Sequence, residues 1–232
     1  MKNIFFNPAK FNYYADIFFK PLIIMSFLSL AVGLSFVFFL SPDDYQQGST
    51  VKIMYIHVPS AWLAMLTFLI MTIYSIIALS FKMPFGFIVN SAVAPIGATF
   101  TLICLVTGSL WGKPMWGTWW VWDARLTSVA ILFLIYLIII VFKKSFSRVE
   151  IGEKITAVLV IVSSINLPII KFSVDWWNTL HQPASISKFS SPSIHYSMMI
   201  PLIIMTFSFI CIGLLIAIMR IKSEIEERKY NN

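Results

Sequence analysis

Tryptophan and histidine concentrate in two short stretches of this sequence. The first, which we call the Trp-rich segment, spans residues 111–128 and holds five of the eight tryptophans. The second reads Asp175-Trp176-Trp177-Asn178 and is followed closely by His181. An indole ring offers a large apolar face, and aromatic contacts contribute ~0.5–1.5 kcal/mol per pair beyond burial. The two stretches therefore indicate a binding surface for a flat, apolar ligand, although a plain aromatic belt at the membrane interface is the alternative.

Part of the Trp-rich segment has the i, i+3, i+4, i+7 spacing of a helix face: Trp116, Trp119, Trp120 and Asp123. This spacing predicts a short interfacial helix that presents these side chains on one side. Arg125 and Lys113 are candidates to neutralise the carboxylates of an anionic ligand. The alternative is structural, because Asp123 and Arg125 also suit an ion pair or a cap at the start of the next helix.

Two of the three histidines, His57 and His181, flank the tryptophans, and His57 is expected at the mouth of the second predicted helix. The two are expected to come from separate loops. Neutral imidazoles are good axial ligands for haem iron, and two loops can approach an iron from opposite faces. A single histidine at the mouth of a helix is more often a hydrogen-bonded interfacial residue. A zinc site needs three or four ligands, and only His195 and acidic loop residues are available to complete one. We interpret His195, beside Tyr196, as structural.

The composition places these residues in a membrane protein. The 232 residues are 59% hydrophobic and only 12% charged, with a mean hydropathy of +0.85, whereas soluble domains have about 25% charged residues. Cys104 and Cys211 both lie in apolar runs, which argues against a disulfide framework or a thiol redox enzyme. The sequence has no Lys/Arg stripe with interleaved aromatics, so its positive charge does not indicate a nucleic-acid partner. Six apolar runs predict transmembrane helices at about 21–40, 56–80, 87–110, 126–142, 154–171 and 196–219.

Charge orients these helices. Twelve of the 17 Lys and Arg residues fall in the termini and in the loops after the second and fourth helices, which the positive-inside rule assigns to the cytoplasm. We therefore expect an all-α membrane protein, a single integral domain over 1–232 with six transmembrane helices and cytoplasmic termini. The Trp-rich segment, between the third and fourth helices, then faces outward.

The motifs also resemble a known family. The run WGTWWVWDARLTS at 116–128 is similar to the "WWD" signature of haem-handling proteins. His57-Val58-Pro59, the run WGKPM at 111–115 and the run KFSVDWWNTLHQP at 171–183 resemble the CcmC branch, the haem exporter protein C of cytochrome c maturation. The resemblance covers nearly the whole chain.

This resemblance implies a haem-handling protein rather than an enzyme. His57 and His181 match the axial ligands of haem b, which the family holds as cargo at the outer face of the bacterial inner membrane; the mitochondrial inner membrane is less expected. The WWD domain forms the haem platform, and the implied cofactor-binding residues beside the histidines are Trp116, Trp119, Trp120, Trp122, Asp123, Arg125, Trp176 and Trp177. The implied partners are a CcmE-type haem chaperone, a CcmA/CcmB-type ABC transporter complex, a small CcmD-type membrane protein and membrane lipid.

Two other classes of function stay open on the sequence. A multi-pass small-molecule permease is expected to have broken helices or charges near the membrane midplane, and only Asn166/Pro168 and Pro95/Gly97 hint at one. A structural subunit of an ABC complex would use the Trp-rich segment for docking and would bind no chromophore.

Overall fold

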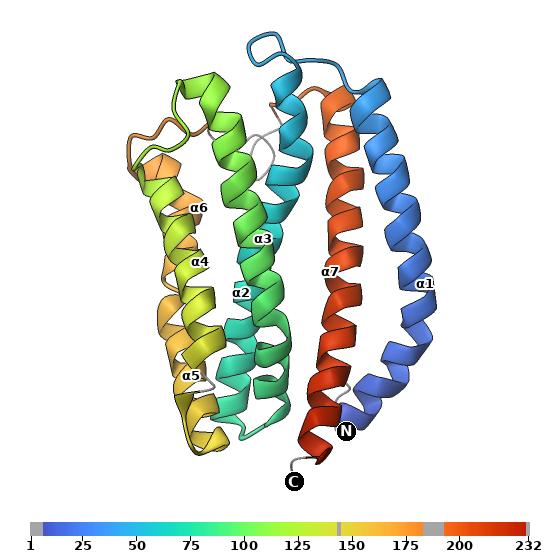
Figure 1. Cartoon of the computed structure of the whole chain (residues 1–232), viewed down its shortest axis with the longest axis vertical. Coiled ribbons are helices and arrows are strands. Elements are labelled where there is room, and N and C mark those ends of the chain that lie inside the picture. Colours follow the sequence, from blue (N-terminus) through green and yellow to red (C-terminus); the bar gives the residue numbers. More distant parts are fainter. Residues whose placement is uncertain (1–6, 143–144, 183–192, 231–232) are drawn as a thin grey trace.

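The computed structural model describes residues 7–142, 145–182 and 193–230, which form a bundle of long helices (Figure 1). The described residues contain no β-strand. In chain order the elements are α1 (Pro8–Ser35), η2 (Phe36–Leu40, π-helical), η3 (Ser49–Ile53, 3-10), α2 (Met54–Ser80), α3 (Phe85–Trp116), α4 (Ala124–Phe142), α5 (Val149–Ser163), α6 (Asn166–Trp176) and α7 (Tyr196–Tyr230). They make six spans that are long and apolar enough to cross a membrane, so the predicted all-α membrane fold is confirmed.

The first helix begins before the expected residue 21. Its N-cap is Asn7, whose Oδ1 accepts a hydrogen bond from the backbone N–H of Ala9 at 3.0 Å, and Pro8 occupies the first turn. Pro21 lies inside the helix. Residues 8–20 are less apolar than the run after them, and hydropathy alone therefore placed the start of the helix too late.

The last helix continues beyond the expected residue 219, to Tyr230. Its charged end is helical because its charges are paired. Lys229 Nζ lies 2.7 Å from Glu226 Oε1 on the same helix, and Arg228 Nη2 lies 2.5 Å from Oε1 of the buried Glu153 on α5. The second pair ties the end of α7 to the rest of the bundle.

The expected helix at 154–171 is instead two helices, α5 and α6, with a break at Ser164 and Ile165. Pro168 explains the position of the break, because proline has no N–H to donate to the carbonyl four residues earlier, that of Ser164. That carbonyl accepts from Leu167 N at 3.0 Å instead. The second helix runs on to Trp176, which brings the Asp175-Trp176-Trp177-Asn178 cluster to one end of the bundle.

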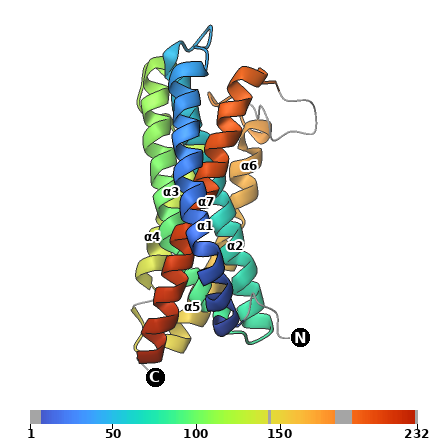
Figure 2. The ribbon, with the colours of Figure 1, turned by 90° about the vertical axis from the view of Figure 1, so that its right-hand side faces the viewer.

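The six spans alternate in direction, with α5 and α6 forming one span, and the start of α1 and the end of α7 lie at the same end of the bundle (Figures 1 and 2). α1 packs mainly on α7, whereas α2 and α3 form the closest pair and contact α4, α5 and α7. The loop after η2, the end of α3 and the end of α6 lie at the opposite end (Figure 1). We call this the Trp-rich end, because it contains the Trp-rich segment.

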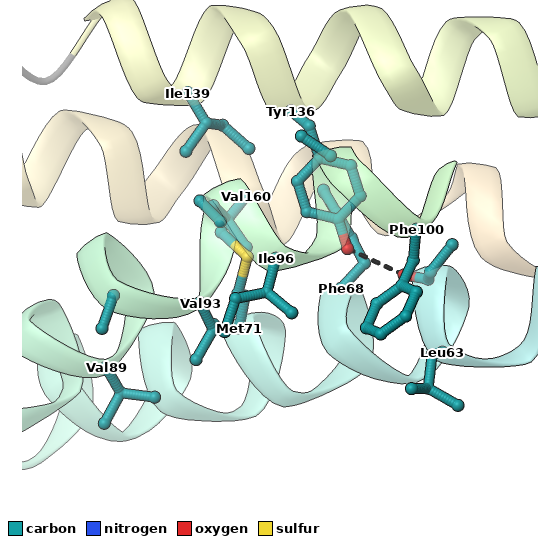
Figure 3. Close-up of a cluster of buried hydrophobic side chains, with 14 of the residues drawn as sticks. Leu63, Phe68, Met71, Val89, Val93, Ile96, Phe100, Tyr136, Ile139 and Val160 are labelled. Atoms are coloured by element: carbon teal, nitrogen blue, oxygen red, sulfur yellow. Dashed lines mark hydrogen bonds between the residues drawn. The ribbon is translucent and has the colours of Figure 1, made fainter. Parts of the chain in front are cut away.

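The main core lies where α2, α3, α4 and α5 meet (Figure 3). Tyr136 of α4 is fully buried there, its ring packs edge-on against Phe68 with 5.2 Å between centroids, and its hydroxyl donates to the Ala64 carbonyl at 2.7 Å. Within a membrane, such an interhelical hydrogen bond satisfies a polar group that lipid cannot. The core therefore fixes the position of α4, and with it the end of the Trp-rich segment.

Gly97 of α3 gives a direct test of this packing. A Cβ built at Gly97 would lie 2.2 Å from the Tyr136 hydroxyl oxygen, so we expect Gly97→Ala to force α3 and α4 apart. Overpacking of this kind costs about 1–3 kcal/mol, which thermal unfolding in detergent measures. Gly213→Ala, where the nearest atom is 3.3 Å away, is the matched control. Equal melting temperatures for the two variants would contradict the tight α3–α4 contact.

Candidate haem site

Two histidines that are far apart in the sequence meet at the Trp-rich end. The rings of His57 and His181 have centroids 6.5 Å apart and planes inclined by 33°. His181 follows the end of α6 and lies in a loop, as expected. His57 lies in the first turn of α2, which a 3-10 turn precedes. Its expected place at the mouth of the second helix is therefore confirmed, whereas the expectation that it comes from a loop was wrong.

His57 is held against α3. Its Nδ1 lies 3.1 Å from the Cys104 carbonyl oxygen and 3.1 Å from Thr107 Oγ1, and its ring meets Trp111 edge-on at 5.7 Å. Donation of the Nδ1 proton to the carbonyl leaves Nε2 with a free lone pair. Metal-binding histidines typically have this second hydrogen bond, which sets the tautomer and the ring orientation.

His181 is held by its own loop and lies beside Arg125. Its Nδ1 lies 2.9 Å from the Gln182 carbonyl oxygen and 3.4 Å from Arg125 Nη1. The two contacts need opposite tautomers, and the shorter one favours donation from Nδ1, which again leaves Nε2 free. Burial lowers the pKa of His181; the hydrogen bond to Gln182 opposes this, and the Arg125 cation adds to the lowering. A neutral imidazole, the form that binds metal, is therefore favoured.

Arg125 joins three parts of the site. From the first turn of α4 it donates through Nε to Ser173 Oγ at 3.0 Å and through Nη2 to the Lys171 carbonyl at 3.3 Å, both on α6. Its third contact is His181. Ser173 is fully buried, and no motif in the sequence marks it as a site residue. The guanidinium therefore links α4 to α6 and lies beside the His181 ring.

Asp123 caps α4. Its Oδ1 accepts the backbone N–H of Leu126 at 2.8 Å, which is the structural role considered for it. The other carboxylate oxygen, Oδ2, is buried and has no hydrogen-bond partner among the described residues, and the same holds for Trp120 Nε1. Both polar atoms lie in the segment that the sequence predicts to bind a ligand.

The predicted interfacial helix over Trp116–Asp123 is wrong. α3 continues to Trp116 and ends at Gly117, whose φ of 75° is left-handed and suits glycine. Residues 117–123 are then non-helical. The Trp116 ring covers Gly112, where a Cβ would lie 2.9 Å from the ring. The helical spacing in the sequence was real, but the left-handed Gly117 interrupts it.

Four tryptophans of the two stretches are exposed. Trp119 is 54% exposed, with Lys113 Nζ 5.8 Å from its ring centre, and Trp122 is 81% exposed and lies edge-on to Trp120. At the end of α6, Trp176 and Trp177 are 56% and 50% exposed. Lys113 Nζ also donates to the Gly117 carbonyl at 2.9 Å, so it stabilises the end of α3.

Trp111 belongs to the Trp-rich segment and had no predicted role of its own, but its contacts make it a site residue. Its Nε1 donates to Gln47 Oε1 at 2.7 Å, while its ring contacts His57. The Gln47 loop is itself ordered by Asp44, whose Oδ1 accepts the backbone N–H groups of Gln46 and Gln47, both at 2.9 Å. The Gln47 loop therefore holds the Trp111 ring, which in turn packs against His57.

A zinc site finds no support in the described residues, which contain no group of three or more His, Cys, Asp and Glu side chains placed to bind a metal ion. His195 bonds to the nearby Ser197 Oγ at 2.8 Å and packs on Tyr196, which matches its structural interpretation. The imidazoles that meet are those of His57 and His181.

The sequence matches the model of a known family, described as heme exporter protein C (CcmC), over residues 1–232. The heme exporter protein C of Bradyrhizobium diazoefficiens is 50% identical over 200 residues, which cover 86% of this chain and 76% of the relative. The protein of the same name from Haemophilus influenzae is 45% identical over 87% of this chain and 82% of its own.

A mitochondrial relative is similar to the same degree. The putative cytochrome c biosynthesis ccmC-like mitochondrial protein of Marchantia polymorpha is 49% identical over 181 residues, 78% of this chain and 75% of its own. The similarity thus extends over most of the chain in bacterial and organellar proteins alike, and this chain belongs to the heme exporter protein C family.

Proposed function

We propose that this protein binds haem b as cargo at the Trp-rich end, with His57 and His181 as the axial ligands of the iron. The observation that carries the proposal is the pairing of the two rings, 6.5 Å apart, each with Nδ1 beside a backbone carbonyl. Two metal–imidazole bonds of about 2 Å each, plus the distance from each nitrogen to its ring centre, amount to roughly 6 Å. The separation and the free Nε2 atoms therefore suit one iron between the rings.

The exposed tryptophans suit the rest of the ligand. Haem is a flat, apolar macrocycle with two propionates, and Trp119, Trp122, Trp176 and Trp177 offer indole surface beside the histidines' end of the bundle. Arg125 and Lys113 bring positive charge to the same end, which favours the propionates. The protein contacts of both cations indicate that they also shape the site.

The role we propose is presentation rather than catalysis. His57 belongs to a transmembrane helix and packs on a second one, whereas His181 lies on a loop, and loops open more easily than packed helices. A site with one firmly held ligand and one on a loop suits a cargo that must leave. The recipient would be a CcmE-type haem chaperone, with CcmA/CcmB-type ABC transporter subunits and a CcmD-type small protein in the same complex.

The Trp-rich end would face outward, the periplasm in a bacterium. The support is the distribution of basic residues: described Lys and Arg side chains at the opposite end include Lys10, Lys20, Lys82, Arg148, Lys154, Arg220, Lys222, Arg228 and Lys229. Positive charge of this kind is retained in the cytoplasm. Names of relatives include bacterial and mitochondrial proteins, and we place this chain in a bacterial inner membrane.

A permease remains the second candidate function, because the break between α5 and α6 is a discontinuous helix of the type that transporters use. Asn166 next to the break is buried, and its Nδ2 donates to the Ser128 carbonyl at 2.9 Å. This satisfied contact joins α6 to α4 and so supports the arrangement of the haem site. We therefore favour haem handling.

Trp119→Ala and Trp120→Ala are expected to weaken haem retention or transfer while the protein still inserts into the membrane. Loss of one aromatic contact of ~0.5–1.5 kcal/mol corresponds to a roughly 2- to 10-fold effect. The measurement is haem content per purified protein, together with covalent haem on the chaperone in a strain that lacks its own family member. Phe81→Ala, an exposed ring at the opposite end, is the control. Full cytochrome c maturation with both tryptophan variants would rule out the platform.

A further inference from the structure

One face of α3 forms a close support for His57. Besides the Cys104 carbonyl, it includes the Thr107 hydroxyl, 3.1 Å from Nδ1. It also includes Gly108, where a Cβ would lie 3.1 Å from His57 Cε1 and 3.5 Å from Nδ1. The imidazole ring therefore lies directly against the helix backbone.

The hydrogen bonds of Thr107 determine whether its hydroxyl donates to His57 Nδ1 or accepts from it. Its Oγ1 donates to the Ile103 carbonyl at 2.6 Å and also lies 3.2 Å from the Cys104 carbonyl. A hydroxyl has one proton, so with that proton directed to the backbone, Oγ1 can only accept from His57. Both neighbours of Nδ1 are then acceptors. This arrangement requires a proton on Nδ1 and leaves Nε2 as the ligating nitrogen.

Gly108 contributes by its lack of a side chain. It lies inside α3, and among the described glycines only Gly48 and Gly117 have positive φ, so the backbone conformation does not require glycine at 108. The limited space beside His57 does require glycine, because a contact of 3.1 Å is tighter than a normal Cβ contact. A methyl group at this position would push the ring away from both acceptors.

We propose that Thr107 and Gly108 are positioning residues for His57 that fix its tautomer and orientation toward the haem iron. The proposal rests on the proposed haem function and goes beyond it, because neither residue is a ligand. Two acceptors on Nδ1–H also make the imidazole a stronger electron donor, which stabilises ferric over ferrous iron. Among the described residues His181 has no such pair of acceptors, since its second neighbour is the cationic donor Arg125.

The first test is Thr107→Val, which keeps the shape and removes the acceptor. We expect the haem midpoint potential to become more positive. We also expect haem transfer to a haem-free scavenger protein to be roughly 10-fold faster or more, as when other hydrogen-bond partners of metal-binding histidines are removed. Thr107→Ser should restore both values. Thr99→Val is the matched control, because Thr99 also donates to the carbonyl four residues earlier on α3, but it is exposed and does not contact His57.

The second test leaves the hydroxyl in place. Gly108→Ala should convert part of the low-spin haem to a high-spin form and speed its loss. Gly213→Ala adds a methyl in a comparably tight position, 3.3 Å from Leu63, and should do neither. Helix content by circular dichroism identifies any variant that fails to fold. If either Thr107→Val or Gly108→Ala fails to fold, the other one tests the positioning role.

The outcomes separate this inference from the haem function itself. If the unmodified protein is colourless after haem supply, the proposed function fails. If it has low-spin haem, but Thr107→Val matches Thr99→Val and Gly108→Ala matches Gly213→Ala in potential and retention, only the positioning role is overturned.

Discussion

Purified His57→Ala and His181→Ala proteins are each expected to lack the low-spin visible absorption of bis-histidine haem. Each substitution removes one of the two imidazoles whose ring centroids lie 6.5 Å apart, and alanine offers no ligand in its place. The expected effect is complete loss of the low-spin bands, with haem content reduced by roughly 10-fold or more, because a lost ligand costs more than a lost hydrogen-bond partner of a ligand. The measurement is the visible spectrum after expression with haem supply.

His195→Ala is the control for this pair, because His195 is exposed and hydrogen-bonds to Ser197, two residues further along the chain. It should retain the wild-type spectrum. A low-spin spectrum in either His57→Ala or His181→Ala, at wild-type haem content, would show that the ligands lie elsewhere.

Arg125→Lys is expected to have the second largest effect although it keeps the positive charge. The guanidinium reaches Ser173, the Lys171 carbonyl and His181 at once, and an ammonium group cannot span the same three points. Hydrogen bonds of charged groups contribute about 1.5–3 kcal/mol. Loss of one corresponds to a roughly 10-fold or greater fall in haem retention, and the melting temperature should fall as well.

The matched control is Arg220→Lys at the opposite end of the bundle. Arg220 also donates from Nε to a backbone carbonyl, that of Ala92, at 2.7 Å, so it measures the general cost of such a change. We expect it to lower stability without selective loss of haem. Equal haem retention in the two variants would mean that Arg125 does not organise the site.

The sequence predicted the fold class well because the membrane imposes a simple rule. Apolar runs of about 20 residues must be helices. The rule fails at the ends of helices, where other interactions decide. Asn7 and Pro8 start α1 in a less apolar region, and the Arg228–Glu153 pair stabilises the last turns of α7. Neither the cap nor the ion pair changes hydropathy.

The candidate site was predictable in its residue types and less so in its geometry. Helical spacing predicted a helix over Trp116–Asp123, but it cannot reveal that Gly117 is left-handed. The histidine pair followed from residue type and from the family resemblance. The support of His57 by Thr107 and Gly108 did not, because a threonine and a glycine in a transmembrane helix are usually packing residues. Only the contact between two helices identifies them.

The central claim is that one haem iron is bound by both His57 and His181, and electron paramagnetic resonance of the unmodified protein tests it most directly. The protein is purified in mild detergent from haem-supplied cells, oxidised, and measured at low temperature together with its haem content. We predict a low-spin ferric signal of bis-imidazole type at about one haem per chain. A protein with intact helical circular dichroism that has no haem, or whose haem is high-spin, would contradict it.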